Sequence, residues 1–187
     1  MDVRPIGPLG TSVGLAGFNG FARDFIGVRM ALYELTDLLS LIPLLLAGGF
    51  GSLGAIQWIK RKSLWKVDRS ILVLGGFYIL TAALFLLFEV WVVNYRPVLI
   101  EGIAEASYPS STTLLVLCVM PTAALQFRSR IRHLALRKWT IRLIVAFAAF
   151  MVVGRLLSGV HWVTDIIGGL LLSAGLVGLY RAFSGLE

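Results

Sequence analysis

Five apolar stretches, each long enough to cross a bilayer as a helix, constrain this chain more than any other feature. A membrane-spanning helix needs about 20 mostly apolar residues, and its backbone polar groups must be satisfied within the segment. The stretches cover residues 35–59, 70–92, 110–127, 140–157 and 162–182. Because 58% of the 187 residues are hydrophobic and only 14% are charged, the composition is not that of a soluble domain. We therefore predict one all-α membrane domain over residues 1–187, an integral membrane bundle of about five transmembrane helices.

The N-terminal segment, residues 1–34, is expected to lie on the membrane rather than in it. Pro5 and Pro8 interrupt its first part, and residues 14–30 mix bulky apolar side chains with charged ones. This mixture is typical of an amphipathic helix at the membrane interface. We predict such an interfacial helix here, followed by the transmembrane bundle at residues 35–182.

Basic residues concentrate in two loops, and this indicates the orientation of the chain. Short loops rich in lysine and arginine stay on the cytoplasmic side of a membrane. The residues are Lys60, Arg61, Lys62, Lys66, Arg69, Arg128, Arg130, Arg132, Arg137 and Lys138. We predict a multi-pass protein of the cytoplasmic (plasma) membrane whose Arg96 and Arg155 loops face outside. The net charge of +7 does not indicate nucleic acid, because no basic stripe is interleaved with aromatic residues.

Three polar residues near the last apolar stretch, Arg155, His161 and Asp165, are the strongest functional signal. Charged side chains at membrane depth are costly, so they usually mark a functional site. His161 and Asp165 are one helical turn apart if the segment is helical, so the carboxylate could orient the imidazole. Arg155 adds a permanently charged guanidinium that suits phosphate. Together they indicate phosphoryl chemistry.

A second outer segment carries residues that could complete a phosphate site. Arg96 precedes Pro97, and Pro109 precedes Ser110 and Ser111 at the expected start of a helix. Hydroxyl groups and free backbone N–H groups at a helix start can hold an anion. We expect Arg96, Ser110, Ser111 and Arg155 to bind phosphate together, because both segments face the same side of the membrane.

These residues resemble the three motifs of the type 2 phosphatidic acid phosphatase superfamily of membrane lipid phosphatases. The motifs are Lys-x6-Arg-Pro, Pro-Ser-Gly-His and Ser-Arg-x5-His-x3-Asp. This chain matches them, in the same order, at Arg96-Pro97, at Pro109-Ser110, and at Arg155, His161 and Asp165. The resemblance covers about residues 70–182. It implies that His161 is the nucleophile that forms a phosphohistidine, that Asp165 orients it, and that Arg96, Ser110 and Arg155 bind phosphate.

The chain departs from these motifs at four positions. Gly154 stands at the first Ser of the third motif, Glu89 at the Lys of the first, and Ser111 and Thr112 at the Gly-His of the second. The resemblance implies that this histidine protonates the leaving oxygen, a role generally worth about 10²–10⁴-fold in rate. Glu89 could be the acid if burial raised its pKa, or it could be a structural carboxylate paired with Arg96. A pyrophosphate leaving group would depend least on an acid.

The resulting hypothesis is a metal-independent lipid phosphatase. Its expected substrate is a polyprenyl pyrophosphate or a phosphatidyl-type lipid phosphate, with the tail remaining among the membrane lipids. No cofactor is expected, and no metal, because His, Cys and carboxylate residues do not cluster in the sequence. Glu101 and Glu105 are expected to be solvated loop residues. The alternatives are a phosphotransferase of the same fold and a non-catalytic lipid-phosphate binding or transport protein with a degraded site.

Overall fold

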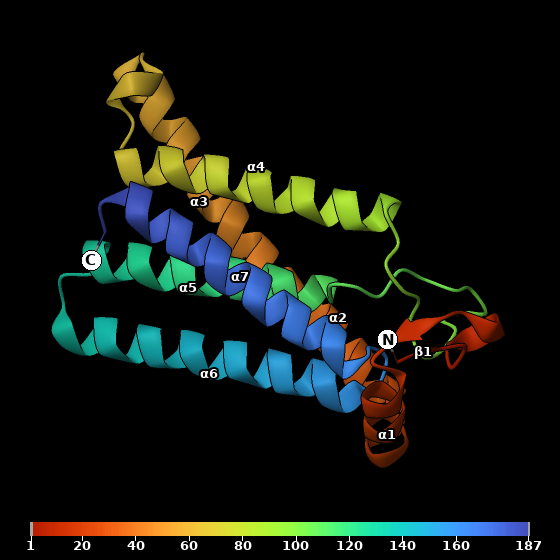
Figure 1. The fold of residues 1–187 in the computed structure, drawn as a ribbon. Helices are drawn as coiled ribbons and strands as arrows, with labels where there is room; N and C mark the ends of the chain where they lie inside the picture. Colours follow the sequence, from red (N-terminus) through yellow and green to blue (C-terminus); the bar gives the residue numbers. More distant parts are fainter. Residues whose placement is uncertain (1, 187) are drawn as a thin grey trace.

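Five long helical segments run side by side along the molecule (Figure 1), and the computed structural model describes residues 2–186 of the chain. The α-helices are α1 (Ala16–Ile26), α2 (Met30–Leu39), α3 (Leu41–Arg61), α4 (Arg69–Val90), α5 (Ser111–Arg130), α6 (Leu134–Ser158) and α7 (Val163–Ser184). Two short strands, β1 (Val3–Arg4) and β2 (Val13–Gly14), pair antiparallel, and 3-10 turns lie at Pro8–Gly10 and Leu64–Lys66. Five segments are long and apolar enough to cross a membrane. The predicted all-α membrane bundle is thereby confirmed.

Helix α5 forms the centre of the bundle. It packs against α3, α4, α6 and α7. In its apolar window 56% of the residues are buried, whereas no other span exceeds 33%. The outer helices turn apolar side chains outward, which is expected where lipid replaces water as the neighbour. The third apolar stretch of the sequence is therefore the one that lies inside the protein.

The first membrane span begins earlier than residue 35, where the sequence placed it. Helices α2 and α3 follow each other with only Ser40 between them, and together form a candidate span over Met30–Arg61. The acidic residues Glu34 and Asp37 make this start less apolar. Asp37 nevertheless fits at the bundle end, because its carboxylate pairs with Arg155 at 3.0 Å.

Helix α1 lies across the end of the bundle (Figure 1), as an interfacial helix should. It is shorter than the expected residues 14–30. Phe21 and Phe25 are 73% and 83% exposed, so they are free to enter the lipid interface. On the opposite side, the buried Asn19 donates to the Thr164 hydroxyl at 3.0 Å, which ties α1 to the start of α7.

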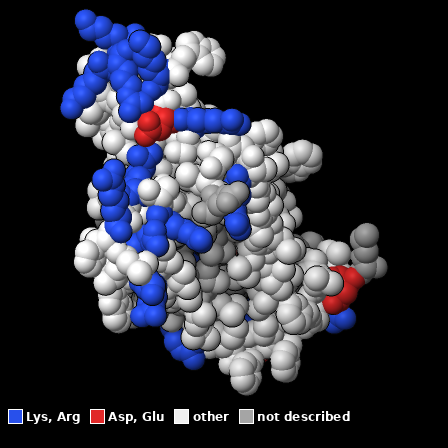
Figure 2. Space-filling view, turned by 90° about the vertical axis from the view of Figure 1, so that its left-hand side faces the viewer, with Lys and Arg blue, Asp and Glu red and all other residues white. Residues whose placement is uncertain are grey.

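The two ends of the bundle differ in charge. Lysine and arginine gather on the end that carries the α3–α4 and α5–α6 loops (Figure 2). The acidic Asp68 lies among them and pairs with Arg61 at 3.0 Å and Arg130 at 3.3 Å. The opposite end carries α1, the α4–α5 loop and the α6–α7 loop. Arg96 and His161 lie in these last two loops, so the fold brings the outer segments of the sequence to one end.

Candidate functional site

The short turn between α6 and α7 places His161. Helix α6 ends at Ser158, and its C-cap Gly159 has a φ of +70°, in the left-handed region that favours glycine. A Cβ at Gly159 would also collide with the carbonyl oxygen of Gly27. Helix α7 then begins with Trp162 as its N-cap, and the Asp165 carboxylate accepts a hydrogen bond from the Trp162 backbone N–H at 2.9 Å. His161 is therefore held between two fixed helix ends.

Ser107 links His161 to Asp165. The Nδ1 atom of His161 lies 3.8 Å from the nearer Asp165 oxygen, which is longer than a hydrogen bond. The Ser107 hydroxyl lies 3.2 Å from Nδ1 and donates to Asp165. Asn94 donates to the other Asp165 oxygen at 3.0 Å. The carboxylate acts only as an acceptor when ionised. The network therefore assigns the proton of the neutral ring to Nδ1, which donates to Ser107.

The other ring nitrogen of His161 carries the lone pair in this network. Its Nε2 atom is buried and has no hydrogen-bond partner among residues 2–186. Burial lowers the pKa of His161, the nearby Asp165 carboxylate opposes this shift, and the charges of Arg96 and Arg155 lower the pKa further. The ring is thus kept neutral near pH 7, which is the form a nitrogen nucleophile requires.

Arg96 lies against Tyr33 of α2 and against Glu105 of its own loop. It is only 8% exposed. One terminal nitrogen donates to the Tyr33 hydroxyl at 3.2 Å, and the other pairs with Glu105 at 3.0 Å. Its guanidinium carbon lies 5.5 Å from the centre of the Tyr33 ring. Glu105 thus pairs with Arg96, while its side chain stays 40% exposed, in line with the solvated loop residue expected from the sequence.

Arg155 is held by more groups than any other side chain at this end of the bundle. It is 1% exposed. One terminal nitrogen donates to the Tyr33 carbonyl at 3.1 Å and to Thr36 at 3.2 Å. The other donates to Asp37 at 3.0 Å and to Thr112 at 2.6 Å. Its guanidinium carbon lies 4.6 Å from the centre of the same Tyr33 ring that Arg96 contacts. The two arginines therefore meet at one aromatic side chain.

Three buried nitrogen atoms of this region lack a partner within the described chain: Nε of Arg96, Nε of Arg155 and Nε2 of His161. Buried polar atoms are nearly always paired, so such a group at one end of a bundle requires an explanation. Two of the atoms are donors on positive charges, and the third carries a lone pair. An anion with an electrophilic centre satisfies all three, and phosphate is such a group.

Three predicted site residues remain. Ser110 and Ser111 lie at the start of α5, and Glu89 lies near the end of α4. Ser110 is buried, donates its backbone N–H to the Asp165 carbonyl at 3.2 Å and accepts from the Thr113 hydroxyl at 3.0 Å. Ser111 is half-buried and opens α5. Glu89 is exposed near the end of α4, and the acidic partner of Arg96 is Glu105. The burial and the pairing considered for Glu89 are both absent.

Four residues that complete the site were not identified from the sequence: Tyr33, Thr36, Asp37 and Ser107. Three of them belong to α2, more than 100 residues from Arg155 along the chain. Asp37 did carry a signal, since an acidic residue inside an apolar span is expected to have a function or a buried partner. Ser107 carried none, because nothing in its immediate sequence distinguishes it from other loop serines.

The glycine at position 154 accounts for the close approach of α2. A Cβ built on Gly154 would lie 2.8 Å from the Thr36 methyl carbon, too close for van der Waals contact. A serine, which the resembling motif has at this position, would push α2 away from α6. The departure from the motif at Gly154 is therefore linked to the residues that α2 supplies to Arg155.

Comparison with known proteins finds similarity to phosphatases of Bacillus subtilis. Phosphatidylglycerophosphatase B of Bacillus subtilis (strain 168) is 29% identical to the chain over 134 residues, which are 70% of this chain and 64% of that protein. The matched part thus spans less than two thirds of that relative. The crystal structure of a transmembrane PAP2 type phosphatidylglycerolphosphate phosphatase from Bacillus subtilis has the same fold. Its TM-score is 0.60 at 23% identity, over 91% of this chain and 85% of that one.

Comparison with models of protein families identifies the family of the chain. The model of the PAP2 superfamily matches residues 80–185, more than half of the chain, and this range contains Arg96, Ser110, Arg155, His161 and Asp165. The resemblance inferred from the motifs is thereby confirmed, and the chain belongs to the PAP2 superfamily.

Proposed function

We propose that the protein is a membrane lipid phosphatase that works through a phosphohistidine at His161. The single observation that carries this proposal is the environment of the His161 ring. Its Nδ1 is held by Ser107, while its buried Nε2 has no partner in residues 2–186. A nitrogen prepared in this way, next to two arginines, is suited to attack phosphorus.

In the proposed reaction, the substrate phosphate lies between Arg96, Arg155 and Nε2 of His161. The lone pair of Nε2 attacks phosphorus, and the bond from phosphorus to the leaving oxygen breaks, with its electron pair staying on that oxygen. The ring becomes positively charged, and Asp165 stabilises it through Ser107. Water then attacks phosphorus, the phosphorus–nitrogen bond breaks, and inorganic phosphate is released. The arginines stabilise charge on the phosphoryl oxygens in both steps.

The geometry near Arg155 supports an amphiphilic substrate. A cavity of about 450 Å³ lies between α2, α3, α4 and α5. Asp37, Ser111 and Thr112 line its polar part, and side chains such as Leu44 and Phe85 line its apolar part. A lipid phosphate could place its headgroup near Arg155 and its hydrocarbon tail along the apolar wall of this cavity. This arrangement favours a lipid phosphate over a water-soluble ester.

The group at position 112 supports a pyrophosphate as the preferred headgroup. Thr112 stands where the resembling motif has its acid, and its hydroxyl accepts a hydrogen bond from Arg155. A hydroxyl of ordinary pKa donates a proton poorly near neutrality. Glu89 is exposed and makes no contact with Arg96, so it is poorly placed to replace the acid. When a pyrophosphate is cleaved, the leaving group is itself a phosphate and departs without help.

A phosphatidyl monophosphate is the second candidate substrate, because the curated relative from Bacillus subtilis is a phosphatidylglycerophosphatase. Two other activities use the same residues differently. A phosphotransferase would pass the phosphoryl group from His161 to an acceptor other than water. A binding or transport protein would hold the lipid phosphate on Arg96 and Arg155 without reaction. Release of phosphate from lipid substrates in detergent, with and without a chelator, separates these alternatives and tests metal independence.

His161→Ala should reduce phosphate release to background, because it removes the nucleophile, while lipid-phosphate binding through the arginines persists. Ser107→Ala should lower the rate about 10- to 100-fold, because hydrogen bonds to charged groups are worth about 1.5–3 kcal/mol. Asp165→Asn should fall between these two. His133→Ala, which changes the histidine of the basic end, is the matched control. Phosphate release that is unchanged in His161→Ala protein would contradict the proposed mechanism.

Without a placed acid, a lipid pyrophosphate should be cleaved about 10²-fold faster or more than a lipid monophosphate with the same tail. The ratio of the two kcat/KM values measures this preference. Glu89→Gln should leave the ratio unchanged, because Glu89 is exposed. A selective loss of monophosphate turnover in that variant would instead identify Glu89 as the acid. Equal kcat/KM values on the two substrates in the unaltered protein would contradict the predicted preference for pyrophosphate.

We place the active site on the outer side of the cytoplasmic membrane, since the basic end seen in Figure 2 lies opposite to it. Cysteines introduced at Lys62 and Arg132 should then react with an impermeant maleimide only from the cytoplasm, and one at Glu101 only from outside. The native Cys118 is fully buried and should stay unlabelled. Labelling of position 101 from the cytoplasm would place the substrate in the inner leaflet.

A further inference from the structure

A second cavity lies outside the active site, on the face of the bundle where α6 and α7 diverge. Both helices pack against α5 but make few contacts with each other. The cavity between them measures about 550 Å³. Short side chains leave this space open, namely Pro121 and Ala124 of α5 with Ala148 and Ala149 of α6. We call this cavity the α5–α7 groove.

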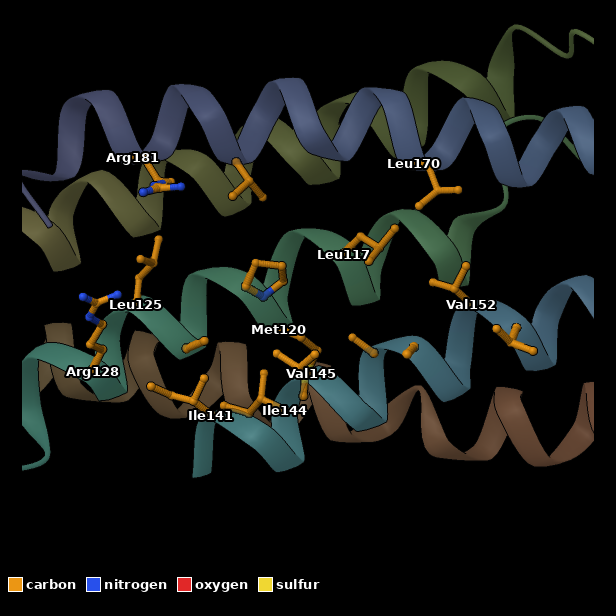
Figure 3. A pocket seen from close by; sticks show the side chains of 16 residues that line it. Leu117, Met120, Leu125, Arg128, Ile141, Ile144, Val145, Val152, Leu170 and Arg181 are labelled. Carbon is orange, nitrogen blue, oxygen red and sulfur yellow. The ribbon is translucent and has the colours of Figure 1, made fainter. Parts of the chain in front are cut away.

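The groove has one charged end and one apolar end. Arg128 of α5 and Arg181 of α7 lie together at one end, and Leu117, Val152 and Leu170 lie at the other (Figure 3). Both arginines are exposed. Within residues 2–186 neither side chain forms an ion pair, whereas Arg61 and Arg130 at the same end pair with Asp68. Two guanidinium groups therefore remain available at the mouth of an apolar groove.

The apolar wall alone does not select a ligand, because lipid tails elsewhere in the membrane are equally apolar. Selectivity must come from the charged end. Guanidinium groups donate several parallel hydrogen bonds to phosphate or carboxylate oxygens. Basic pockets between transmembrane helices are suited to anionic lipid headgroups, which long-range attraction also concentrates there. The lining residues of α5 run from Leu117 to Arg128, so the groove follows that helix for about three turns.

We propose that the α5–α7 groove binds one anionic phospholipid of the leaflet opposite to the active site. Its headgroup contacts Arg128 and Arg181, and one acyl chain lies along Pro121, Ala124 and Ala148. This site is separate from the catalytic one, and it does not depend on whether His161 is a nucleophile. A helix from a second copy of the chain would fill the same groove without using the arginines, and the charge therefore favours the lipid.

Native mass spectrometry of the detergent-solubilised protein tests this proposal. The probes are phosphatidylserine and phosphatidylcholine with identical acyl chains, added in equal amounts. We expect the first bound lipid to be phosphatidylserine. The double variant Arg128→Gln/Arg181→Gln should lose this preference, by about fivefold for each arginine, which corresponds to the usual attraction of one basic residue for an anionic membrane.

Two further variants localise the effect. Arg132→Gln/Arg137→Gln removes the same charge from the same end without touching the groove, and it should keep the preference for phosphatidylserine. Ala149→Phe fills the groove from an exposed position, so the fold should tolerate it, and it should reduce binding of both lipids. Thermal unfolding without added lipid checks that each variant is folded.

Equal binding of the two lipids to the unaltered protein would overturn the proposal, as would an unchanged preference in Arg128→Gln/Arg181→Gln. A loss of preference in the control double variant would show general attraction rather than a site. A dimer that Ala149→Phe converts to a monomer, with no lipid bound in either state, would assign the groove to a second copy of the chain. None of these results depends on phosphatase activity.

Discussion

The burial of Arg155 is the constraint on which the rest of the site depends. A guanidinium that is 1% exposed at the end of a membrane bundle must find partners within the protein. Helix α2 supplies Tyr33, Thr36 and Asp37, and α5 supplies Thr112. Removing Arg155 would leave the Asp37 carboxylate without its partner. The ion pair therefore joins the N-terminal part of the chain to the motif helices, and it positions a positive charge beside His161.

The buried Asp165 also needs partners within the protein, and these partners fix the position of His161. Asp165 is fully buried, and every contact of its carboxylate comes from a donor: Asn94, Ser107 and the Trp162 backbone. Asp165 thus caps α7 and, through Ser107, fixes the His161 ring. One carboxylate serves both the fold and the proposed chemistry, so a shift of the start of α7 would also move the His161 ring.

Much of the fold followed from the sequence because its signals are local. Length and apolarity predicted the five spans, but two of them begin earlier than expected. The span Met30–Arg61 begins before Glu34, and Leu134–Ser158 begins before the basic residues Arg137 and Lys138, so charged side chains concealed both starts. The motif positions Arg155, His161 and Asp165 followed from spacing along one short segment. The contacts of Tyr33, Thr36 and Asp37 could not be predicted, because no spacing rule connects α2 with a residue more than 100 positions away. The exposure of Glu89 likewise depends on which face of α4 meets α7, which the uniformly apolar α4 does not reveal.

The most direct test of the central claim is capture of the phosphorylated enzyme during turnover. A lipid pyrophosphate labelled in its terminal phosphate would be mixed with the protein, quenched in base within milliseconds, and digested with trypsin. The peptide Leu156–Arg181 contains His161 as its one histidine. We predict that this peptide carries a single phosphoryl group, stable in base and lost in acid. A phosphoryl group on another peptide, or turnover with no phosphorylated peptide at any time, would contradict the assignment of His161 as the nucleophile.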